Sequence, residues 1–283
     1  MRYFKKTAEY LFKLEKGKRF LLLFLLSLPI GIAIAAANPV GALFDWLAGY
    51  ETGNDSFAAA WTFGGTIPAV PTGIAIAAAF VLMLFFMSVS VTVISRSLRV
   101  GVFKVNGIFR DFNENFIPVL QAVFCYSVAA LLIKVLTTAI IILPQGISNA
   151  ALSATISAAL LVGAYAAVAL IMSIGILYLP YMTFNGLNSF HAYTAASSAV
   201  SGKTFPRMFG AVAVPLAVWL AVSFAVGAAG SRLASFIVEA VLDSALIVYF
   251  ITLAFISYYE ILGLVREDYP KDYFYYKPRR KDK

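Results

Sequence analysis

The sequence predicts an all-α polytopic membrane protein with six transmembrane helices and two cytoplasmic amphipathic segments. Its composition is 61% hydrophobic and 13% charged, and its mean hydropathy is +0.85. So few polar residues cannot cover the surface of a soluble globule of 283 residues. Six apolar runs are also close to or above the roughly 20 residues that a helix needs to cross a bilayer. These runs are 20–37, 72–95, 117–143, 154–182, 208–230 and 234–265.

The positive charges lie almost entirely on one side of these runs. Of the 22 Lys and Arg residues, 20 fall before the first run, or after the second, fourth or sixth. Arg232 lies in an opposite connection, and Lys134 lies within the third run. Because cytoplasmic loops carry the excess of Lys and Arg, the pattern predicts a multi-pass protein of the cell (plasma) membrane with both termini cytoplasmic. The net charge of +8 therefore reports topology, and we expect no nucleic-acid partner.

The chain divides into a basic cytoplasmic N-terminus, a transmembrane domain and a basic-aromatic cytoplasmic tail, at 1–19, 20–265 and 266–283. The transmembrane domain includes an external loop at 38–71, which has three acidic residues and no cation, and the cytoplasmic amphipathic segments 96–116 and 183–207. The first run resembles a signal peptide in its basic start and small-residue end. Five further runs favour its retention, because cleavage would reverse the tail against the charge pattern.

The heptapeptide GIAIAAA occurs twice, at 31–37 and 73–79. The first copy ends an outward helix and the second begins an inward one, which a direct duplication of a hairpin would not produce. Small residues four apart let helix backbones approach closely in lipid, and this spacing occurs at Gly31, Ala35, Gly73 and Ala77. Helix packing is one interpretation; a substrate-lining helix break near Pro29 or Pro71 is the other.

The segment 96–116 carries aromatic residues at helical spacing opposite charged ones. The aromatic face is expected to lie on the membrane, and it contains Phe103, Phe109, Phe112 and Phe116. A contact with a soluble partner through Asp111 and Glu114 is the alternative to a solvated charged face. The segment 183–207 repeats the arrangement, with Phe and Pro at the point of membrane re-entry in both.

Three stretches resemble known protein families: GIFRDFNENFIPVL at the third run, LPYMTFNGLNSFHAYTAASSAVSGKTFPRMFG between the fourth and fifth, and FISYYEILG near the end of the sixth. They resemble bacterial six-span membrane families, among them the YesL-like proteins and the membrane domain found beside some glycerophosphodiester phosphodiesterases. The resemblance implies a six-span architecture and brings no catalytic residues with it.

Catalytic and metal sites find little support in the sequence. The single histidine, His191, has no Cys, Asp or Glu near it at metal-ligand spacing, and the single cysteine, Cys125, lies in an apolar run. Phosphate-loop, nucleophile-elbow and zinc-protease motifs do not occur in the chain. The sequence therefore predicts a protein that is not an enzyme and that uses no cofactor or metal.

Three ionisable residues lie inside the runs: Lys134, Glu239 and Asp243. At about 1.5 Å per residue, Lys134 and Asp243 lie at similar depth in the outer half of the membrane. An intramembrane pair or an ion pathway is one interpretation, because such groups tend to face a bundle interior. The other is that Lys134 snorkels outward and that the sixth helix begins near Ser244.

The tail combines cations with tyrosines, which favours contact with anionic lipid; a solubilising disordered tail is the alternative. Its central cations are Lys277, Arg279, Arg280 and Lys281. We therefore expect a non-catalytic accessory or scaffold subunit that docks a protein partner, a second copy or anionic lipid at its cytoplasmic face. The alternative is a small transporter with a pathway near Lys134, Glu239 and Asp243.

Overall fold

The computed structural model is helical throughout the part of the chain that it describes, residues 2–37, 69–101, 103, 107–142, 147, 149–229 and 232–268, apart from short connections. Those ranges contain no strand. The helices are α1 Arg2–Ala8, α2 Lys18–Ala37, α5 Ala69–Val100, α6 Ile108–Ile142, α7 Ala150–Gly175, α8 Tyr178–Asn185, α9 Ser189–Ala199, α10 Phe205–Ala228 and α11 Arg232–Leu262. One π-helical turn, η1 Glu9–Lys13, and two 3₁₀-helical turns, η2 Leu14–Gly17 and η4 Gly202–Thr204, complete the described helical elements.

Five helical stretches among the described residues are long and apolar enough to cross a membrane. They are Lys18–Ala35, Phe80–Val100, Ala151–Asn185, Gly202–Gly227 and Leu233–Leu262. This finding gives the chain the all-helical, membrane-like character that its composition predicts. The third expected span falls in α6, which is one continuous helix through Ile142. Whether α6 also crosses the membrane stays a prediction.

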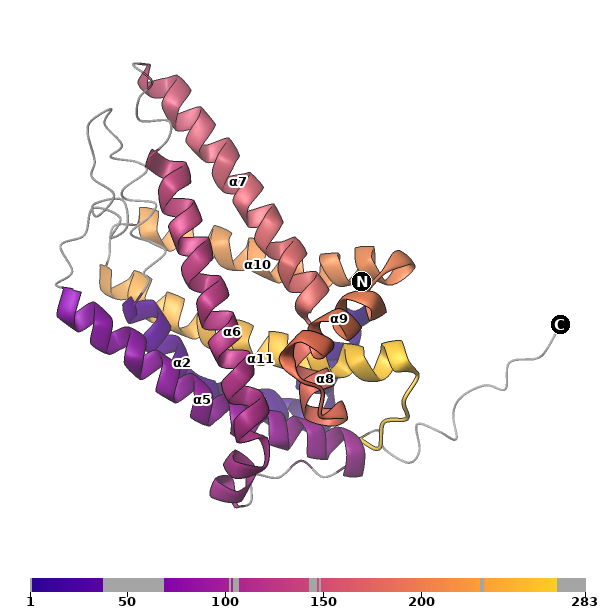
Figure 1. The fold of residues 1–283 in the computed structure, drawn as a ribbon. Coiled ribbons are helices and arrows are strands. Elements are labelled where there is room, and N and C mark those ends of the chain that lie inside the picture. Colours follow the sequence, from indigo (N-terminus) through magenta and orange to yellow (C-terminus); the bar gives the residue numbers. More distant parts are fainter. Residues whose placement is uncertain are drawn as a thin grey trace.

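Helix α11 is the centre of the fold. It packs most extensively against α2, and it also contacts α10, α1, α8 and α5. In Figure 1, α2, α5, α10 and α11 run across the view in similar directions, while α6 and α7 rise steeply across them. The buried core lies where α2, α5 and α11 meet, with Leu23, Ile94 and Phe255 among its least exposed side chains.

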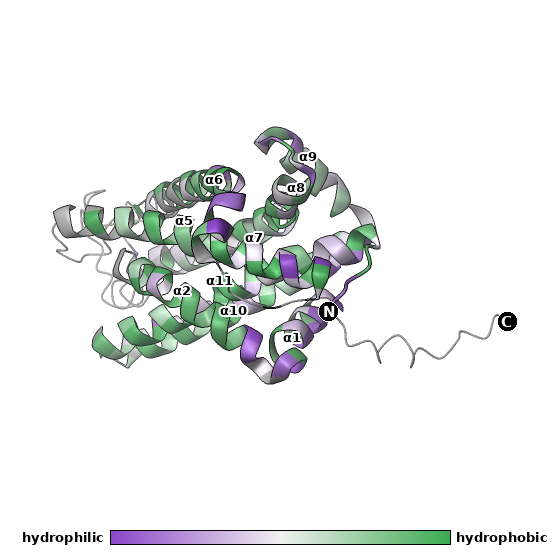
Figure 2. Cartoon of the chain, turned by 90° about the horizontal axis from the view of Figure 1, so that it is seen from below, coloured by the Kyte–Doolittle hydropathy of each residue, from purple (hydrophilic) through white to green (hydrophobic). Residues whose placement is uncertain are grey.

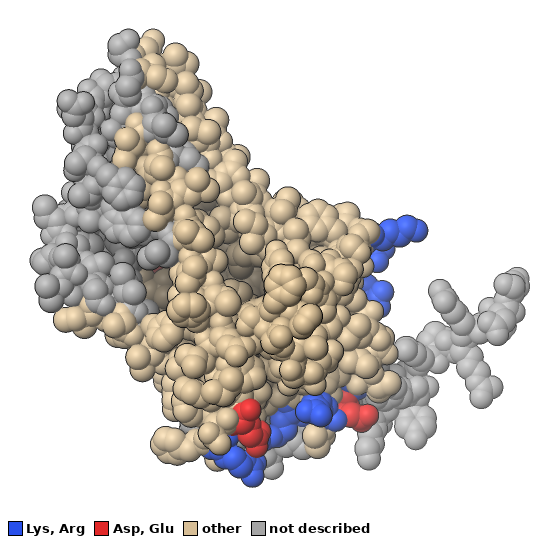
Figure 3. Space-filling model, viewed as in Figure 1, with Lys and Arg blue, Asp and Glu red and all other residues tan. Residues whose placement is uncertain are grey.

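Hydrophilic residues gather at one end of the helices. Figure 2 shows hydrophobic residues along most of their length, with hydrophilic ones concentrated near the N-terminus. In Figure 3, Lys and Arg gather at the lower edge, with acidic residues beside them, and a smaller group of Lys and Arg lies at the right edge. We call this region the charged end; it comprises the described residues of 2–19, 96–110, 203–207 and 260–268.

The segment 96–116 is not the separate surface helix that its periodicity predicts. Residues 96–100 complete α5, which ends at Gly101 with a φ of 73°, and α6 begins at Ile108. Phe112 packs on Phe85 of α5 with ring centroids 5.4 Å apart, and Phe116 packs on Phe112 at 5.0 Å. Only Phe109 of these aromatic side chains is highly exposed, at 82%. Packing between α5 and α6 therefore takes up residues expected to lie on the membrane.

The expected fourth run, 154–182, is divided. Helix α7 ends at Gly175, residues 176–177 form a turn, and α8 continues from Tyr178. Pro180 explains the break, because it has no N–H to donate to the carbonyl four residues earlier. A short turn therefore interrupts the helix within the expected span.

Helix α9 is the ordered centre of the second expected segment, 183–207. Asn188 caps its N-terminus, because the Asn188 side chain accepts a hydrogen bond from the backbone N–H of His191 at 3.0 Å. Ala192 and Ala196 form its buried side. Phe190 is 74% exposed and Tyr193 is also exposed. The helix thus packs through small residues and leaves aromatic ones on the surface.

Candidate functional site at the charged end

Three buried charged residues meet at the charged end: Arg19 at the start of α2, and Arg266 and Asp268 beyond α11. We call them the arginine cluster. Arg19 Nη1 lies 3.2 Å from Asp268 Oδ2, and Arg266 Nη2 lies 2.9 Å from the same oxygen. Arg266 Nε also donates to Asp268 Oδ1 at 3.0 Å. The side chains are 3%, 3% and 0% exposed, so water screens these charges little.

Local backbone geometry brings the two ends of the chain together. Glu15 has a φ of 56° and Gly17 a φ of 80°, so the chain turns sharply between η1 and α2. A left-handed backbone costs a non-glycine residue on the order of 1–2 kcal/mol, and the Glu15 carboxylate, 3.1 Å from Arg19 Nη2, offsets part of this. The reversal returns residues 2–13 to the same end of the bundle as the arginine cluster.

The residues after α11 are fixed against α5. The backbone N–H of Glu267 donates to the carbonyl of Leu98 at 3.0 Å. A Cβ on Gly101 would lie 2.6 Å from the Glu267 carbonyl oxygen, so only glycine allows this approach. Residues 266–268, expected to begin a free cytoplasmic tail, are thus part of the folded core.

Tyr10 forms the floor of the cluster. Its ring centroid lies 4.7 Å from the Arg19 guanidinium carbon and 5.9 Å from that of Arg266, which are cation–π distances. Burial raises the pKa of Tyr10 to about 12, and the nearby Ser97 hydroxyl and the two arginines oppose this only in part. Tyr10 is therefore neutral near pH 7.

The cluster retains unsatisfied hydrogen-bonding atoms. Tyr10 Oη, Arg19 Nε and Ser97 Oγ are buried and have no hydrogen-bond partner among the described residues. The hydroxyls of Tyr10 and Ser97 are neighbours, but their geometry falls short of a hydrogen bond. A buried atom without a partner costs about 1–3 kcal/mol, which opposes part of the stability gained at this cluster.

A second set of ion pairs holds α1 along α11. Arg2 Nη2 lies 2.9 Å from Glu260 Oε2, and Lys6 Nζ pairs with Glu260 Oε1. Phe4 packs near Tyr249 with ring centroids 5.9 Å apart. Arg2 is exposed, so its pair is worth less than about 1 kcal/mol. The burial of Tyr3, Thr7 and Tyr10 is the larger contribution to this docking.

The predicted intramembrane residues are only partly brought together. Asp243 and Glu239 are buried one turn apart in α11. The Asp243 carboxylate accepts a hydrogen bond from Trp219 Nε1 of α10 at 2.8 Å, and Ser235 Oγ donates to Glu239 at 3.3 Å. Lys134 lies in α6, and its side chain lies outside the described residues. The structure therefore assigns Asp243 a tryptophan partner that the depth argument did not identify.

The first GIAIAAA copy lies at the crossing of α2 and α11. A Cβ on Gly31 would lie 2.3 Å from the Ala240 carbonyl oxygen and 2.1 Å from Ser244 Oγ, so the helices touch backbone to backbone. Ala35 is also buried. In the second copy Ala77 is exposed, and the surroundings of Gly73 lie outside the described side chains. The two copies thus do not share one environment.

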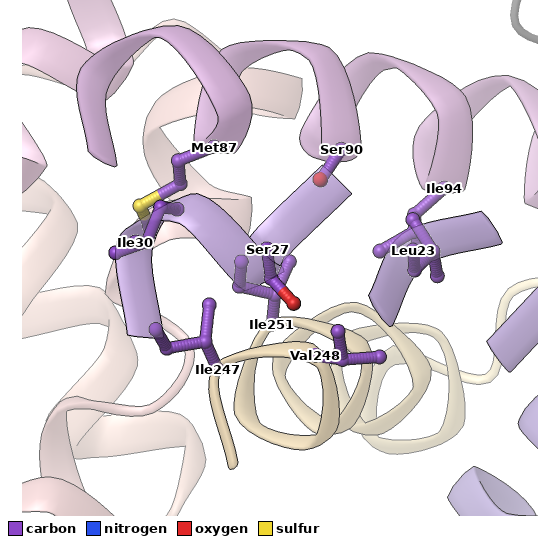
Figure 4. Close-up of a pocket in the computed structure, with 9 residues that line it drawn as sticks. All are labelled: Leu23, Ser27, Ile30, Met87, Ser90, Ile94, Ile247, Val248 and Ile251. Carbon is purple, nitrogen blue, oxygen red and sulfur yellow. The ribbon is translucent and has the colours of Figure 1, made fainter. Parts of the chain in front are cut away.

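A small cavity lies beside this crossing. Its volume is about 10 Å³, and α2, α5 and α11 all contribute to its lining. Figure 4 shows Ser27 and Ser90 among seven apolar side chains there. This volume is about that of one water site, so the cavity is too small for a substrate.

Pro215 lies inside α10, and tyrosines of neighbouring helices accommodate it. Proline has no N–H, so the Ala211 carbonyl four residues earlier loses its helical donor. Tyr249 of α11 donates to this carbonyl at 2.7 Å, and Tyr165 of α7 donates to the nearby Ala213 carbonyl. Neighbouring helices thus satisfy the freed backbone, as apolar surroundings require.

The other predicted sites lie apart from one another. Phe103 lies 5.3 Å from the Arg19 guanidinium carbon, so it belongs to the surroundings of the arginine cluster. His191 is an exposed residue in the first turn of α9. The tail cations predicted to bind lipid, Lys277, Arg279, Arg280 and Lys281, lie outside the described residues. So does the predicted external loop 38–71, except that its last residues, 69–71, begin α5.

Sequence reasoning missed the arginine cluster because it treated Arg19 and Arg266 only as topological cations. Two local signals exist. Glu15 precedes Arg19 by four residues, which is the spacing of a helical ion pair. The run Arg266–Glu267–Asp268 places opposite charges directly after an apolar helix. Neither signal shows that the two ends of the chain meet.

Within the described ranges, no group of three His, Cys, Asp or Glu residues is placed to hold a metal ion. No family model, curated protein or solved structure matches the chain. The arrangement of its own residues therefore carries the functional argument.

Proposed function

We propose that this chain is a non-catalytic subunit of a membrane complex, with a cytoplasmic docking platform formed by the charged end. The observation that carries the proposal is the arginine cluster. It ties the residues before the first span to those after the last, so both terminal segments are held at one place. Buried ion pairs contribute little net stability but can specify one arrangement, and the unsatisfied atoms around Tyr10 agree with such a role.

The surface of the charged end supports docking. Phe109 of α6 is an exposed aromatic residue of the charged end and lies beside the exposed Arg110. Helix α9, which leads into η4 and the charged end, adds the exposed Phe190 and Tyr193. Residues 266–268, the described part of the predicted basic tail, are held in this cluster and against α5. Aromatic residues and Arg are enriched at protein interfaces relative to the rest of the surface. By the positive-inside pattern, this end faces the cytoplasm.

Purification from native membranes tests this function. The wild-type protein is expected to co-purify with a partner in fixed stoichiometry. Phe190→Ser removes an exposed contact, and Asp268→Asn loosens the platform; both are expected to reduce the partner's yield. Asp243→Asn is the control, because it also neutralises a carboxylate but lies far along α11 from the cluster. Absence of a stoichiometric partner, or equal retention by all variants, would refute the platform.

Transport is the second candidate function, because Glu239 and Asp243 are buried one turn apart in a candidate span. Ionisable residues at such positions commonly line ion pathways. Proteoliposomes containing the wild type, Asp243→Asn or Asp268→Asn separate the two candidates. A proton or cation flux that Asp243→Asn abolishes and Asp268→Asn preserves would favour transport over the docking platform.

A further inference from the structure

The N-terminal segment carries a shallow open groove that takes no part in the arginine cluster. The groove is lined by Phe4, Lys5, Ala8, Glu9, Phe12 and Lys13. Phe4 and Phe12 are 39% and 55% exposed. Lys5 and Lys13 are exposed too, and neither pairs with a carboxylate among the described residues. In Figure 2, α1 lies beside the N-terminus at the hydrophilic end.

The wide helical turn η1 builds this groove. Phe4 and Phe12 are eight residues apart, as are Lys5 and Lys13. In a regular α-helix, residues eight apart differ in direction by about 80°. The π-helical turn Glu9–Lys13 changes this spacing, and the two phenylalanines and two lysines line one surface. Turns of this kind are rare and frequently lie at functional sites.

An aromatic strip continues from the groove along the first candidate span. The rings of Phe12 and Phe20 are 4.7 Å apart, and those of Phe20 and Phe24 are 5.6 Å apart. Leu21 and Leu25, in the same turns of α2, are exposed. Because α2 begins at Lys18, the groove lies at the membrane boundary and the strip leads into the apolar layer.

We infer that the groove binds one anionic phospholipid, with its headgroup at Lys5 and Lys13 and an acyl chain along Phe12, Phe20 and Phe24. Two lysines against the single carboxylate of Glu9 leave the groove positive, which complements a phosphate. Aromatic side chains favour the interface between headgroup and hydrocarbon. This inference rests on the proposed function, since it names the lipid held at the cytoplasmic platform.

The test uses the full chain, purified in detergent and delipidated, and titrated with phosphatidylglycerol or phosphatidylcholine under native mass spectrometry. We expect phosphatidylglycerol to bind more tightly. The double variant Lys5→Gln/Lys13→Gln is expected to lose about thirty-fold in affinity, the factor for two cations near an anionic surface. Lys203→Gln/Arg207→Gln is the matched control, since it removes the same charge from exposed residues of η4 and α10.

The proposed contact of the acyl chain with the aromatic strip is tested by a separate variant. Phe12→Ala is expected to weaken long-chain phosphatidylglycerol and to leave a dihexanoyl analogue unchanged, because only the long chain reaches the aromatic strip. All four substituted side chains of the two double variants are exposed, so we expect these proteins to fold.

Three results would overturn the assignment. Equal losses in the groove and control variants would show a general charge effect, and equal binding of phosphatidylcholine would remove the electrostatic basis. If Lys5→Gln/Lys13→Gln binds lipid as the wild type does but loses a co-purifying protein, the groove is a protein site; the lipid assignment then fails and the docking platform stands. If no partner co-purifies with the wild type, the docking platform fails, but the lipid-binding measurements remain valid.

Discussion

Neutralising Asp268 is expected to remove an ion-pair partner from two buried arginines at once. Its carboxylate lies 3.2 Å from Arg19 and 2.9 Å from Arg266, and it is fully buried. Removing one partner of a buried ion pair costs about 3–5 kcal/mol, because the other charge remains without compensation. Arg19 keeps its contact with Glu15, so we expect Asp268→Asn to lower the free energy of unfolding by about 3 kcal/mol, the low end of that range.

The assay is thermal or denaturant unfolding in a mild detergent, followed by tryptophan fluorescence. A loss of this size corresponds to a decrease in Tm of about 6–12 °C for a chain of this length. Glu114→Gln is the control; its pair with Arg110 spans 3.5 Å and both side chains are well exposed. It should change stability by less than about 0.5 kcal/mol.

A double variant distinguishes pairing from simple loss of packing. Arg266→Met with Asp268→Leu removes a charge of each sign and leaves Arg19 with Glu15, so it should recover part of the loss caused by Asp268→Asn. The reasoning fails if Asp268→Asn costs less than about 1 kcal/mol, or if the double variant is less stable than the single one.

Three further predictions concern the packing of Gly31, the hydrogen bond of Tyr249 and the burial of Tyr10. Gly31→Ala should separate α2 from α11 and lower the free energy of unfolding in detergent by about 1–3 kcal/mol. Gly163→Ala is the control and should be neutral or stabilising, because its Cβ would meet nothing within 4 Å. Equal effects of the two variants would contradict close packing at Gly31. Tyr249→Phe should lower the free energy of unfolding by about 1–2 kcal/mol, because the Ala211 carbonyl loses its donor. In a double-mutant cycle this cost should be smaller in the Pro215→Ala background, which restores the helical N–H. Strict additivity of the two substitutions would refute the contact. Because the folded pKa of Tyr10 is about 12 and the unfolded value is about 10, the native state holds more protons between these values, so stability falls as pH rises through this window. Tyr10→Phe should lose less stability than the wild type from pH 10 to 12, measured by denaturant unfolding, and parallel profiles would contradict this.

The helical membrane character could be predicted because it depends on composition and run length. Apolar runs mark helices wherever backbone groups must be satisfied without water. The described residues of each expected run are mostly helical, the fourth with a turn before Pro180 and the sixth ending its helix at Leu262. The six-span count and the cytoplasmic placement of both ends stay predictions. So does the resemblance to the YesL-like proteins.

The arginine cluster could not be predicted because it joins residues 249 positions apart. Charge counting assigns Arg19 to a flank of the first span, and nothing nearby shows that its partner follows α11. The groove was missed for a related reason. Helical periodicity assumes a constant twist, and η1 departs from it between Glu9 and Lys13.

The aromatic face of 96–116 shows a further limit of pattern reading. Its spacing fits a helix, but spacing does not distinguish a membrane surface from a neighbouring helix. Phe112 and Phe116 pack beside Phe85 of α5, while Phe109 remains exposed. Similarly, identical heptapeptides bury Ala35 and expose Ala77. Tertiary contacts, which depend on the partner helix, decide these outcomes.

The orientation of the charged end tests the account most directly, because both the docking platform and the lipid groove require it to face the cytoplasm. Topology reporters placed after Lys283 and within 99–110 are expected to read cytoplasmic, and one placed at Gly53 is expected to read external. A cytoplasmic reading at Gly53 together with an external reading after Lys283 would contradict the orientation, and with it both proposals.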